Sequence, residues 1–113
     1  MKLNVKLTTT GRRTGQAREV QLYGFEDGDR LVVVGSRGGA AKDPDWAGNL
    51  RMEPRATIRI GRDARDVRAQ EVAGPERDRL WTLVTVAFPL YASYQRKTDR
   101  VIPLFVLETV ERA

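Results

Sequence analysis

The sequence predicts a mainly β domain, a small closed or split barrel of six antiparallel strands with two or three helices packed outside it. The 113 residues leave room for one domain, which we place over residues 1–113. Patterns typical of strands and helices follow one another in the order β-β-β-α-β-β-α-β. Short loops join neighbouring strands, which favours an antiparallel sheet over a dinucleotide-binding fold. Six such strands in so short a chain suggest a sheet that closes on itself.

The chain begins with three strand patterns. Residues 5–10 are rich in β-branched side chains and alternate in character, and they stop at a turn over 12–15 that two glycines bracket. A second alternating run covers about 18–25, and the Asp-Gly pair in 26–29 is typical of a hairpin loop. The next run, residues 31–34, is apolar at every position, so we expect a central strand that is covered on both faces.

A glycine-rich loop over residues 35–39 separates these strands from the first helix. Asp43 is the predicted N-cap of that helix and Pro44 its first residue, and the helix runs to about Met52, before Pro54. The remaining elements follow from patterns of the same kinds: strands at 56–60 and 64–72, helices at 74–88 and 90–97, and a last strand at 101–110.

The last two helices carry half of the aromatic residues. The apolar residues of the first of them follow the spacing of one buried face: Leu80, Leu83, Val84, Ala87 and Phe88. After Pro89, the short helix places Tyr91 and Tyr94 on one side. Because their neighbours are polar, we expect both tyrosines to be partly exposed, where they could stack on a planar ligand and donate a hydrogen bond. The alternative is that the aromatic residues here, above all Trp81 and Phe88, only cover the barrel.

Two absences in the composition exclude several classes of enzyme. The chain has no cysteine, which excludes disulfides, thiolate nucleophiles, iron–sulfur clusters and thiolate zinc sites. It has no histidine, which excludes a Ser-His-Asp hydrolase and removes the commonest metal ligand, so we expect no metal site. An enzyme of this composition would use a borrowed cofactor. There is no membrane-spanning run and no apolar signal core, so we expect a cytoplasmic protein.

The positive charge of the chain lies in its first half. The net charge is +5, and residues 1–62 hold 12 basic and 7 acidic side chains, whereas residues 63–113 hold 8 of each. Such a local excess indicates a surface that binds an anion, which could be nucleic acid, anionic lipid or a phosphorylated small molecule.

Two basic, glycine-rich segments are the candidates for that surface. Arg12 and Arg13 lie in the turn between Gly11 and Gly15, where guanidinium groups and free amides suit a phosphate or a carboxylate. The loop from Gly35 leads to a helix start but has neither the Walker ending nor the nicotinamide spacing. The alternatives are a solvated hairpin turn and a mobile connector. On the helix that follows, Trp46 and Asn49 share a face; Trp46 suits the core, and Asn49 must reach solvent, backbone or a ligand.

Several of these segments, taken in order, resemble one known family. They are the run LTTTGRRTGQ at 7–16, SRGG at 36–39, KDPDW at 42–46 with Asn49-Leu50, and Tyr91, Tyr94 and TDR at 98–100 ahead of Ile102-Pro103. This set, which spans about residues 6–108, is similar to the deazaflavin-dependent nitroreductase family of actinobacteria. The resemblance implies a split β-barrel, like that of the proteins of the pyridoxamine oxidase type that bind flavin mononucleotide.

The resemblance also implies a cofactor, coenzyme F-420, a 5-deazaflavin with a phosphate and a polyglutamate tail, with flavin mononucleotide as the alternative. The cofactor-binding residues that it implies are Arg12, Arg13, Thr14, Arg18, Tyr23, Ser36, Arg37, Gly38, Gly39, Lys42, Trp46 and Asn49. Of these, Arg12, Arg13, Thr14 and Lys42 would lie near the phosphate and tail. The catalytic residues that it implies are Ser36, Tyr91 and Tyr94, of which the two tyrosines would lie on the side of the acceptor. Arg13 and Arg37 stand where lysine is common in the family, and both keep the positive charge.

The activity that the resemblance implies is the transfer of a hydride from the reduced deazaflavin to a quinone, an enone or a nitroaromatic acceptor. A proton would come from solvent or from a hydroxyl such as that of Ser36 or Tyr94. The alternatives are a barrel that carries the cofactor without turnover, an enzyme that uses flavin mononucleotide, and a basic barrel that binds nucleic acid. Too few aromatic residues alternate with the basic turns for the last of these, so we expect no nucleic-acid partner.

Some members of the family carry an amphipathic extension ahead of the first motif that contacts membranes. This chain begins almost at that motif. We therefore expect a cytoplasmic location, with peripheral membrane contact as the alternative, and either a monomer or a homodimer.

Overall fold

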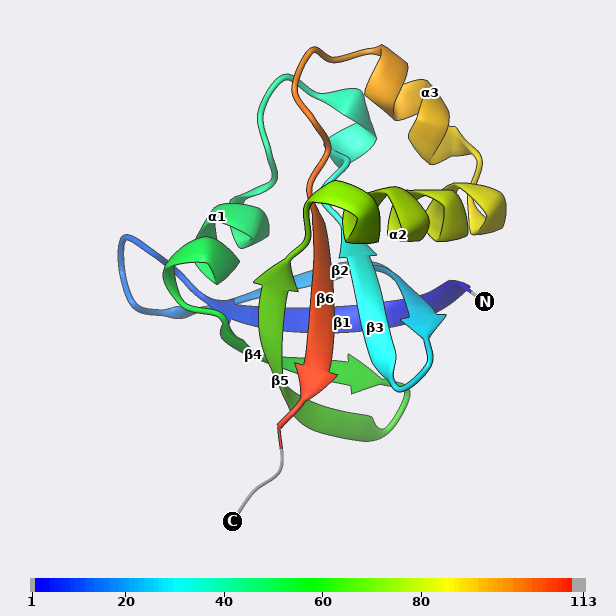
Figure 1. Cartoon of the computed structure of the whole chain (residues 1–113). Helices are drawn as coiled ribbons and strands as arrows, with labels where there is room; N and C mark the ends of the chain where they lie inside the picture. The colour runs from blue at the N-terminus through cyan, green and yellow to red at the C-terminus, as the bar shows by residue number, and fades with distance from the viewer. Residues whose placement is uncertain (1, 111–113) are drawn as a thin grey trace.

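Six strands pair edge to edge and close into a barrel, in the order β1-β2-β3-β6-β5-β4, with β4 returning to β1 (Figure 1). Every pairing is antiparallel, so the predicted fold class is confirmed. The computed structural model describes residues 2–110. Its strands are β1 (Lys2–Thr10), β2 (Ala17–Asp27), β3 (Arg30–Val34), β4 (Arg55–Ile60), β5 (Asp63–Glu71) and β6 (Leu104–Thr109).

The inside of the barrel is filled by alternate residues of the strands, because successive side chains of a strand point to opposite faces. Val5 and Leu7 of β1 lie in this inner core, which α1 (Asp45–Met52) completes from one end of the barrel. Trp46 of that helix is 7% exposed, and its ring lies 5.7 Å from the ring of Phe105 on β6. One face of α1 is therefore part of the core, and its other face, with Asp45 and Arg51, stays at the surface.

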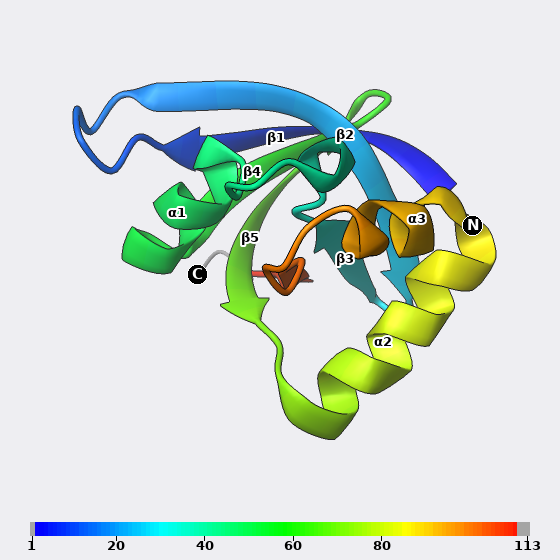
Figure 2. The ribbon, with the colours of Figure 1, turned by 90° about the horizontal axis from the view of Figure 1, so that it is seen from above.

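A second core lies outside the barrel, under α2 (Gly74–Ala87) and α3 (Leu90–Arg96) (Figure 2). Strand β3 belongs to both cores: Leu31 and Val33 point inward, whereas Val32 and Val34 point outward toward the helices. The prediction of a central strand covered on both faces is thus confirmed. The predicted face of α2 is largely confirmed as well, since Leu80 and Val84 are fully buried, but Ala87 at its end is exposed.

The start of the first helix differs from the prediction. The helix begins at Asp45, Pro44 is its N-cap, and the carboxylate of Asp43 caps nothing. Instead, Asp43 accepts hydrogen bonds from Arg51 at 2.8 Å and from Arg100 at 2.7 Å. Two guanidinium donors bind a carboxylate more strongly than a neutral amide does, which explains why the capping position is not used.

The last strand is shorter than predicted, because β6 begins at Leu104 and not at residue 101. Pro103 has no N–H to give to a ladder, and the side chain of Gln95 takes up the backbone groups before it. The Gln95 amide donates to the carbonyl of Arg100 at 2.7 Å and accepts from the N–H of Ile102 at 2.9 Å. These residues are therefore fastened to α3 and not to the sheet. No helix among residues 2–110 is long and apolar enough to cross a membrane.

Candidate functional site

A pocket of about 530 Å³ opens where the β1–β2 turn, the loop after β3 and the first turn of α1 meet. More than half of the residues implied at the cofactor line it: Arg12, Arg13, Thr14, Arg18, Arg37, Trp46 and Asn49. The chain brings these segments together because β1 and β2 form a long hairpin whose turn extends beside α1 (Figure 2). The two basic segments found in the sequence thus form one surface.

The buried Asn49 fastens the β1–β2 turn to α1. Its Oδ1 accepts hydrogen bonds from the backbone N–H of Arg12 at 3.1 Å and from the Arg12 guanidinium at 2.9 Å. Its Nδ2 donates to the hydroxyl of Thr9 at 3.1 Å. The same guanidinium donates to the carbonyl of Asp45 and lies against Gly48, where a Cβ would come within 3.0 Å of its carbon. Asn49 therefore bonds both backbone and side chain, and Arg12 is held in the pocket wall.

Three other arginines of the pocket keep their charge available. No carboxylate of residues 2–110 pairs with Arg13, Arg18 or Arg37. Arg18 makes one long hydrogen bond, 3.5 Å, to the Thr14 hydroxyl, which also accepts from the N–H of Gln16. The pocket therefore presents positive charge that the protein itself does not neutralise, which is the condition for binding a ligand with several negative charges.

The loop after β3 forms a short 3-10 turn, η1 (Arg37–Gly39), with left-handed backbone. Gly38 and Gly39 have φ of 63° and 82°, which glycine adopts at little cost, and Arg37 has φ of 46° despite its Cβ. Gly39 also approaches α3 so closely that a Cβ there would lie 2.7 Å from the carbonyl oxygen of Tyr94. Within the described chain the hydroxyl of Ser36 has no hydrogen-bond partner.

Arg100 holds this loop from behind. Its side chain is 14% exposed and donates to three carbonyls of the loop and to the carboxylate of Asp43. The sequence motif includes Arg100, but we assigned it no role. Nothing in the sequence indicates its pairing with Asp43, which the sequence pattern presents as a helix cap.

The aromatic residues form a chain that begins at η1. The backbone of Tyr94 contacts the loop, and its ring centre lies 6.2 Å from that of Tyr91. The ring centres of Tyr91 and Phe88 are 4.8 Å apart, and those of Phe88 and Tyr23 are 5.5 Å apart. Tyr91 is only 5% exposed, so the expectation of partial exposure is wrong for it and holds for Tyr94. The reason is that the outer side of the barrel, through Phe25, packs against the Tyr91 ring. Burial, and to a lesser extent the neighbouring Tyr23 and Tyr94, raises the pKa of the Tyr91 phenol.

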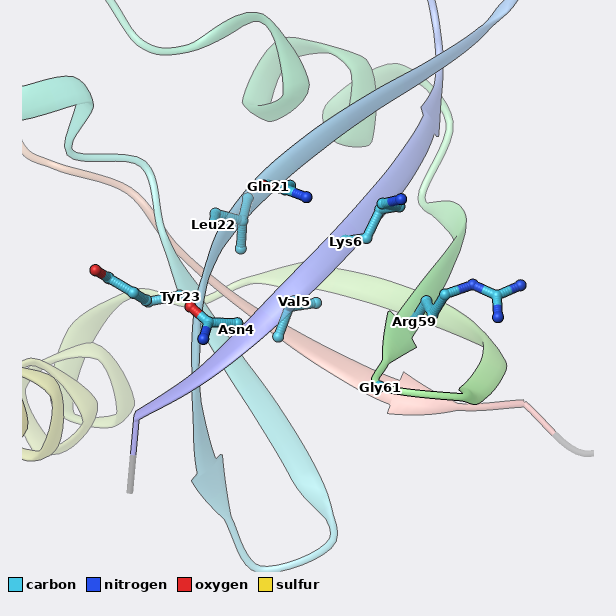
Figure 3. Close-up of a pocket in the computed structure, with 8 residues that line it drawn as sticks. All are labelled: Asn4, Val5, Lys6, Gln21, Leu22, Tyr23, Arg59 and Gly61. Carbon is cyan, nitrogen blue, oxygen red and sulfur yellow. The ribbon is translucent and has the colours of Figure 1, made fainter.

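Tyr23 lies apart from the cationic pocket. It borders a second hollow of about 480 Å³ along β1 and β2, with Tyr23 at one end and Arg59 at the other (Figure 3). The Nζ of Lys2 lies 4.3 Å from the centre of the Tyr23 ring. The remaining implied residues, Ser36, Gly38, Gly39, Lys42, Tyr91 and Tyr94, do not line the cationic pocket either; all but Lys42 belong to the loop and to the aromatic chain that lead away from it.

The arrangement joins two kinds of surface. A cationic pocket suits the phosphate and carboxylates of a ligand, and a row of rings that begins beside the adjoining loop suits planar, apolar molecules. Among residues 2–110 no group of acidic side chains could hold a metal ion. Binding of a large anionic cofactor beside an aromatic acceptor is the chemistry that these residues support best.

Known proteins share both the sequence and the fold. The model of the F-420H(2)-dependent quinone reductase family matches residues 1–109. An F-420H(2)-dependent quinone reductase of Mycobacterium tuberculosis is 38% identical over 104 residues, which cover 89% of this chain and 70% of that protein. The solved structure of an F-420H(2)-dependent reductase, FDR-A, is 40% identical with a TM-score of 0.85 and covers 93% of both chains.

Other solved structures extend the comparison. A structure titled as a domain-swapped dimer is 40% identical, with a TM-score of 0.86, and covers 93% of this chain and 79% of that one. HutZ, a heme storage protein of Vibrio cholerae, is 14% identical with a TM-score of 0.77 over 96% of this chain and 82% of its own, so it shares the fold alone. The match of the family model, the relative at 38% identity and the shared barrel lead to one conclusion. This chain belongs to the F-420H(2)-dependent quinone reductase family.

Proposed function

We propose that this chain is a reductase that binds reduced coenzyme F-420 in its cationic pocket and passes a hydride to a quinone at its aromatic chain. The observation that supports it most is the set of three guanidinium groups, on Arg13, Arg18 and Arg37, that lack a carboxylate partner around one pocket. Membership of the family supports the same cofactor.

The donors of the pocket fit the anionic part of this cofactor. Arg13 and Arg18 would hold the phosphate and the glutamate carboxylates, and Arg37 reaches the same pocket from the loop. Arg12 fits another task, because its guanidinium is already bound by Asn49 and Asp45. We assign it to holding the β1–β2 turn in place. When bound, the reduced deazaflavin supplies a hydride from its C5 carbon.

The chain's own residues would orient the acceptor and provide a proton. The Tyr91 phenol is protonated at neutral pH like any phenol, and burial raises its pKa further, so it can donate a hydrogen bond but cannot take a proton. Ser36 lies in the loop and the backbone of Tyr94 contacts it, and the hydroxyl of either residue could give a proton to the reduced acceptor. Holding donor and acceptor in contact would provide much of the rate.

A binding titration tests the cofactor. We expect the purified protein to bind F-420 with a Kd of about 10 μM or lower, equivalent to about −7 kcal/mol, and flavin mononucleotide more weakly. The fluorescence of each ligand reports its binding. No binding of F-420 at about 100 μM would overturn the proposal, and tighter binding of flavin mononucleotide would favour the flavin alternative.

Oxidation of reduced F-420 by menadione then separates a reductase from a carrier. We expect steady turnover that depends on both substrates. Binding without turnover would support a carrier. Turnover of an enone or a nitroaromatic compound, but not of menadione, would show that the acceptor is not a quinone.

We further propose a homodimer, because a solved relative that is 40% identical is titled as a domain-swapped dimer. Light scattering of the purified protein decides between this and the monomer. The expected cytoplasmic location, and its alternative of peripheral membrane contact, are checked by fractionating cells that express the chain.

A further inference from the structure

The side chain of Arg100 grips one stretch of backbone on both sides of Arg37. It donates to the carbonyls of Gly35 at 3.1 Å and Ser36 at 2.7 Å, and to that of Ala40 at 2.7 Å. The hydrogen bonds leave the guanidinium with almost no freedom, and Asp43 neutralises it at 2.7 Å. Arg100 itself does not line the cationic pocket, whereas Arg37 does. Arg100 therefore holds the loop from outside the pocket.

The geometry of the peptide bond determines where the amides of this loop point. In a trans peptide the C=O and the following N–H point in opposite directions. Because the carbonyls of Gly35 and Ser36 are turned toward Arg100, the N–H groups of Ser36 and Arg37 are turned away from it. Neither N–H donates to any acceptor within residues 2–110, whereas the N–H of Gly35 before them donates to the carbonyl of Pro103 and the N–H of Gly39, two residues after Arg37, donates to that of Ser36.

The loop would not keep this shape without the grip. Arg37 has φ of 46°, a left-handed conformation that costs free energy for a residue with a Cβ. An extended backbone at Arg37 would relieve that cost and would turn its N–H. The hydrogen bonds of Arg100 to Ser36 and Ala40 oppose this, because they fix the residues just before and after the turn.

From this geometry we infer that Arg100 is a positioning residue, which aims the backbone amides of Ser36 and Arg37 at an acceptor oxygen of the bound cofactor. The inference rests on the proposed function, since F-420 is the ligand. The acceptor oxygens of F-420 in question are those of its phosphate and of the carbonyls of its deazaflavin ring. Oxygens of both kinds accept hydrogen bonds from a pair of amides.

A chain of charges anchors Arg100 in turn. Asp43 bridges Arg100 and Arg51, and its carboxylate lies 2.8 Å from the Arg51 guanidinium. Arg51 in turn binds both carboxylate oxygens of Glu71, at 2.8 and 2.9 Å. Glu71 is the last residue of β5, so the anchor ends in the barrel. These side chains thus tie the loop to the sheet in addition to the backbone hydrogen bond from Gly35 to Pro103.

The test compares the binding of two ligands by Arg100 variants. Arg100→Gln should weaken F-420 binding by about 10- to 100-fold, because the N–H groups of Ser36 and Arg37 would no longer be held in the direction of the cofactor. Arg100→Lys, which keeps the charge but cannot reach three carbonyls, should show a similar loss. The KM for F-420 should rise while the KM for menadione stays the same. The control is Arg96→Gln on α3, whose guanidinium meets only the Ser93 hydroxyl and which should bind F-420 like the wild type.

The second ligand is the same deazaflavin without its phosphate and tail. An equal loss for both ligands shows that the amides hold the ring, and a loss for F-420 alone shows that they hold the phosphate. Added guanidinium should restore part of the affinity of Arg100→Ala, which a variant that is only less stable would not show.

Unchanged F-420 affinity in both Arg100→Gln and Arg100→Lys, with thermal unfolding near that of the wild type, would overturn the inference. If Arg100→Gln does not fold, Arg100→Lys decides in the same way. Failure of the wild type to bind F-420 is a different outcome, and it overturns the proposed function.

Discussion

Two groups of arginines in this chain differ in what surrounds them. Where the β2–β3 hairpin meets α2, Arg30 and Arg79 share two carboxylates, those of Asp27 and Glu76. The donors lie 2.6 to 3.3 Å from these oxygens. The hydrogen bond from Arg79, followed by that from Arg30, lowers the pKa of Asp27 to about 2. Here the charges cancel within the protein, and the network joins the hairpin to the helix.

In the cationic pocket only Arg12 meets a carboxylate of residues 2–110, that of Asp45 at 3.4 Å. Arg13, Arg18 and Arg37 have no acidic partner among the described residues. The comparison teaches that the number of arginines says little about function, and that the carboxylates beside them decide it. Paired arginines hold elements together, and unpaired arginines that converge on one pocket are left for a ligand.

Removal of the unpaired group should have the largest effect. The variant Arg13→Ala/Arg18→Ala/Arg37→Ala should lose about 100-fold or more in F-420 affinity, or about 2.7 kcal/mol, because charged hydrogen bonds are lost. Salt should weaken wild-type binding and change that of the variant little. Alanine keeps the Cβ at Arg37, so the backbone cost there is unchanged.

The matched control for that variant is Arg62→Ala, in the exposed β4–β5 turn, which should bind F-420 like the wild type. Isothermal titration at two salt concentrations measures both proteins. A triple variant within about threefold of the wild type would end the distinction between paired and unpaired arginines.

The hydrogen bonds of Asn49 to Arg12 and Thr9 should stabilise the fold, as those of the paired arginines do. Asn49→Ala removes the acceptor of the Arg12 amide and the donor to the Thr9 hydroxyl, both inside the protein. We expect the free energy of unfolding to fall by about 2 to 3 kcal/mol, measured in urea. Asn4→Ala, at an exposed position of β1, should change it by less than about 0.5 kcal/mol. Equal losses of unfolding free energy in the two variants would show that Asn49 does not stabilise the turn.

The hairpin network predicts a dependence of stability on pH. Because the pKa of Asp27 falls from 3.8 to about 2 on folding, its stabilisation is complete above the unfolded value and is lost as the pH falls through 4 toward 2. Asp27→Asn should therefore cost about 1 to 2 kcal/mol at pH 7 and progressively less in acid. Thermal unfolding across this range tests it. A difference that stays constant down to pH 2 would mean that the ion pairs contribute nothing.

The smallest effect concerns Tyr91. Burial raises the pKa of its phenol, so it should not ionise as the pH rises past the ordinary value of 10.0. The tyrosinate absorbance of the wild type and of Tyr91→Phe should therefore coincide up to about pH 11. A step near pH 10 that disappears in Tyr91→Phe would show that the ring is open to water.

Alternation of side chains along the sequence was enough to predict the barrel, because the period of two depends only on neighbouring residues. The partners of charged side chains were not predictable in this way. Asp43 looks like a helix cap until Arg100, 57 residues further on, is seen to bind it. Arg12 and Arg13 look equivalent in the sequence, but Asn49, 37 residues further on, binds Arg12 and not Arg13. Which arginine remains for a ligand depends on contacts that only the closed barrel makes.

The closure of the barrel is uneven, and this bears on how a ligand leaves. Strand β1 pairs with β2 from Lys2 to Thr10, but with β4 only from Lys6 to Thr8 among the described residues. Of the two seams of β1, the one with β4 should therefore open more often, and amide hydrogen exchange should be faster there than along the β1–β2 pairing. Opening at that seam would free the β1–β2 hairpin, which carries Arg13, from β4. The dissociation rate of a tightly held anion would then depend on how often the barrel opens.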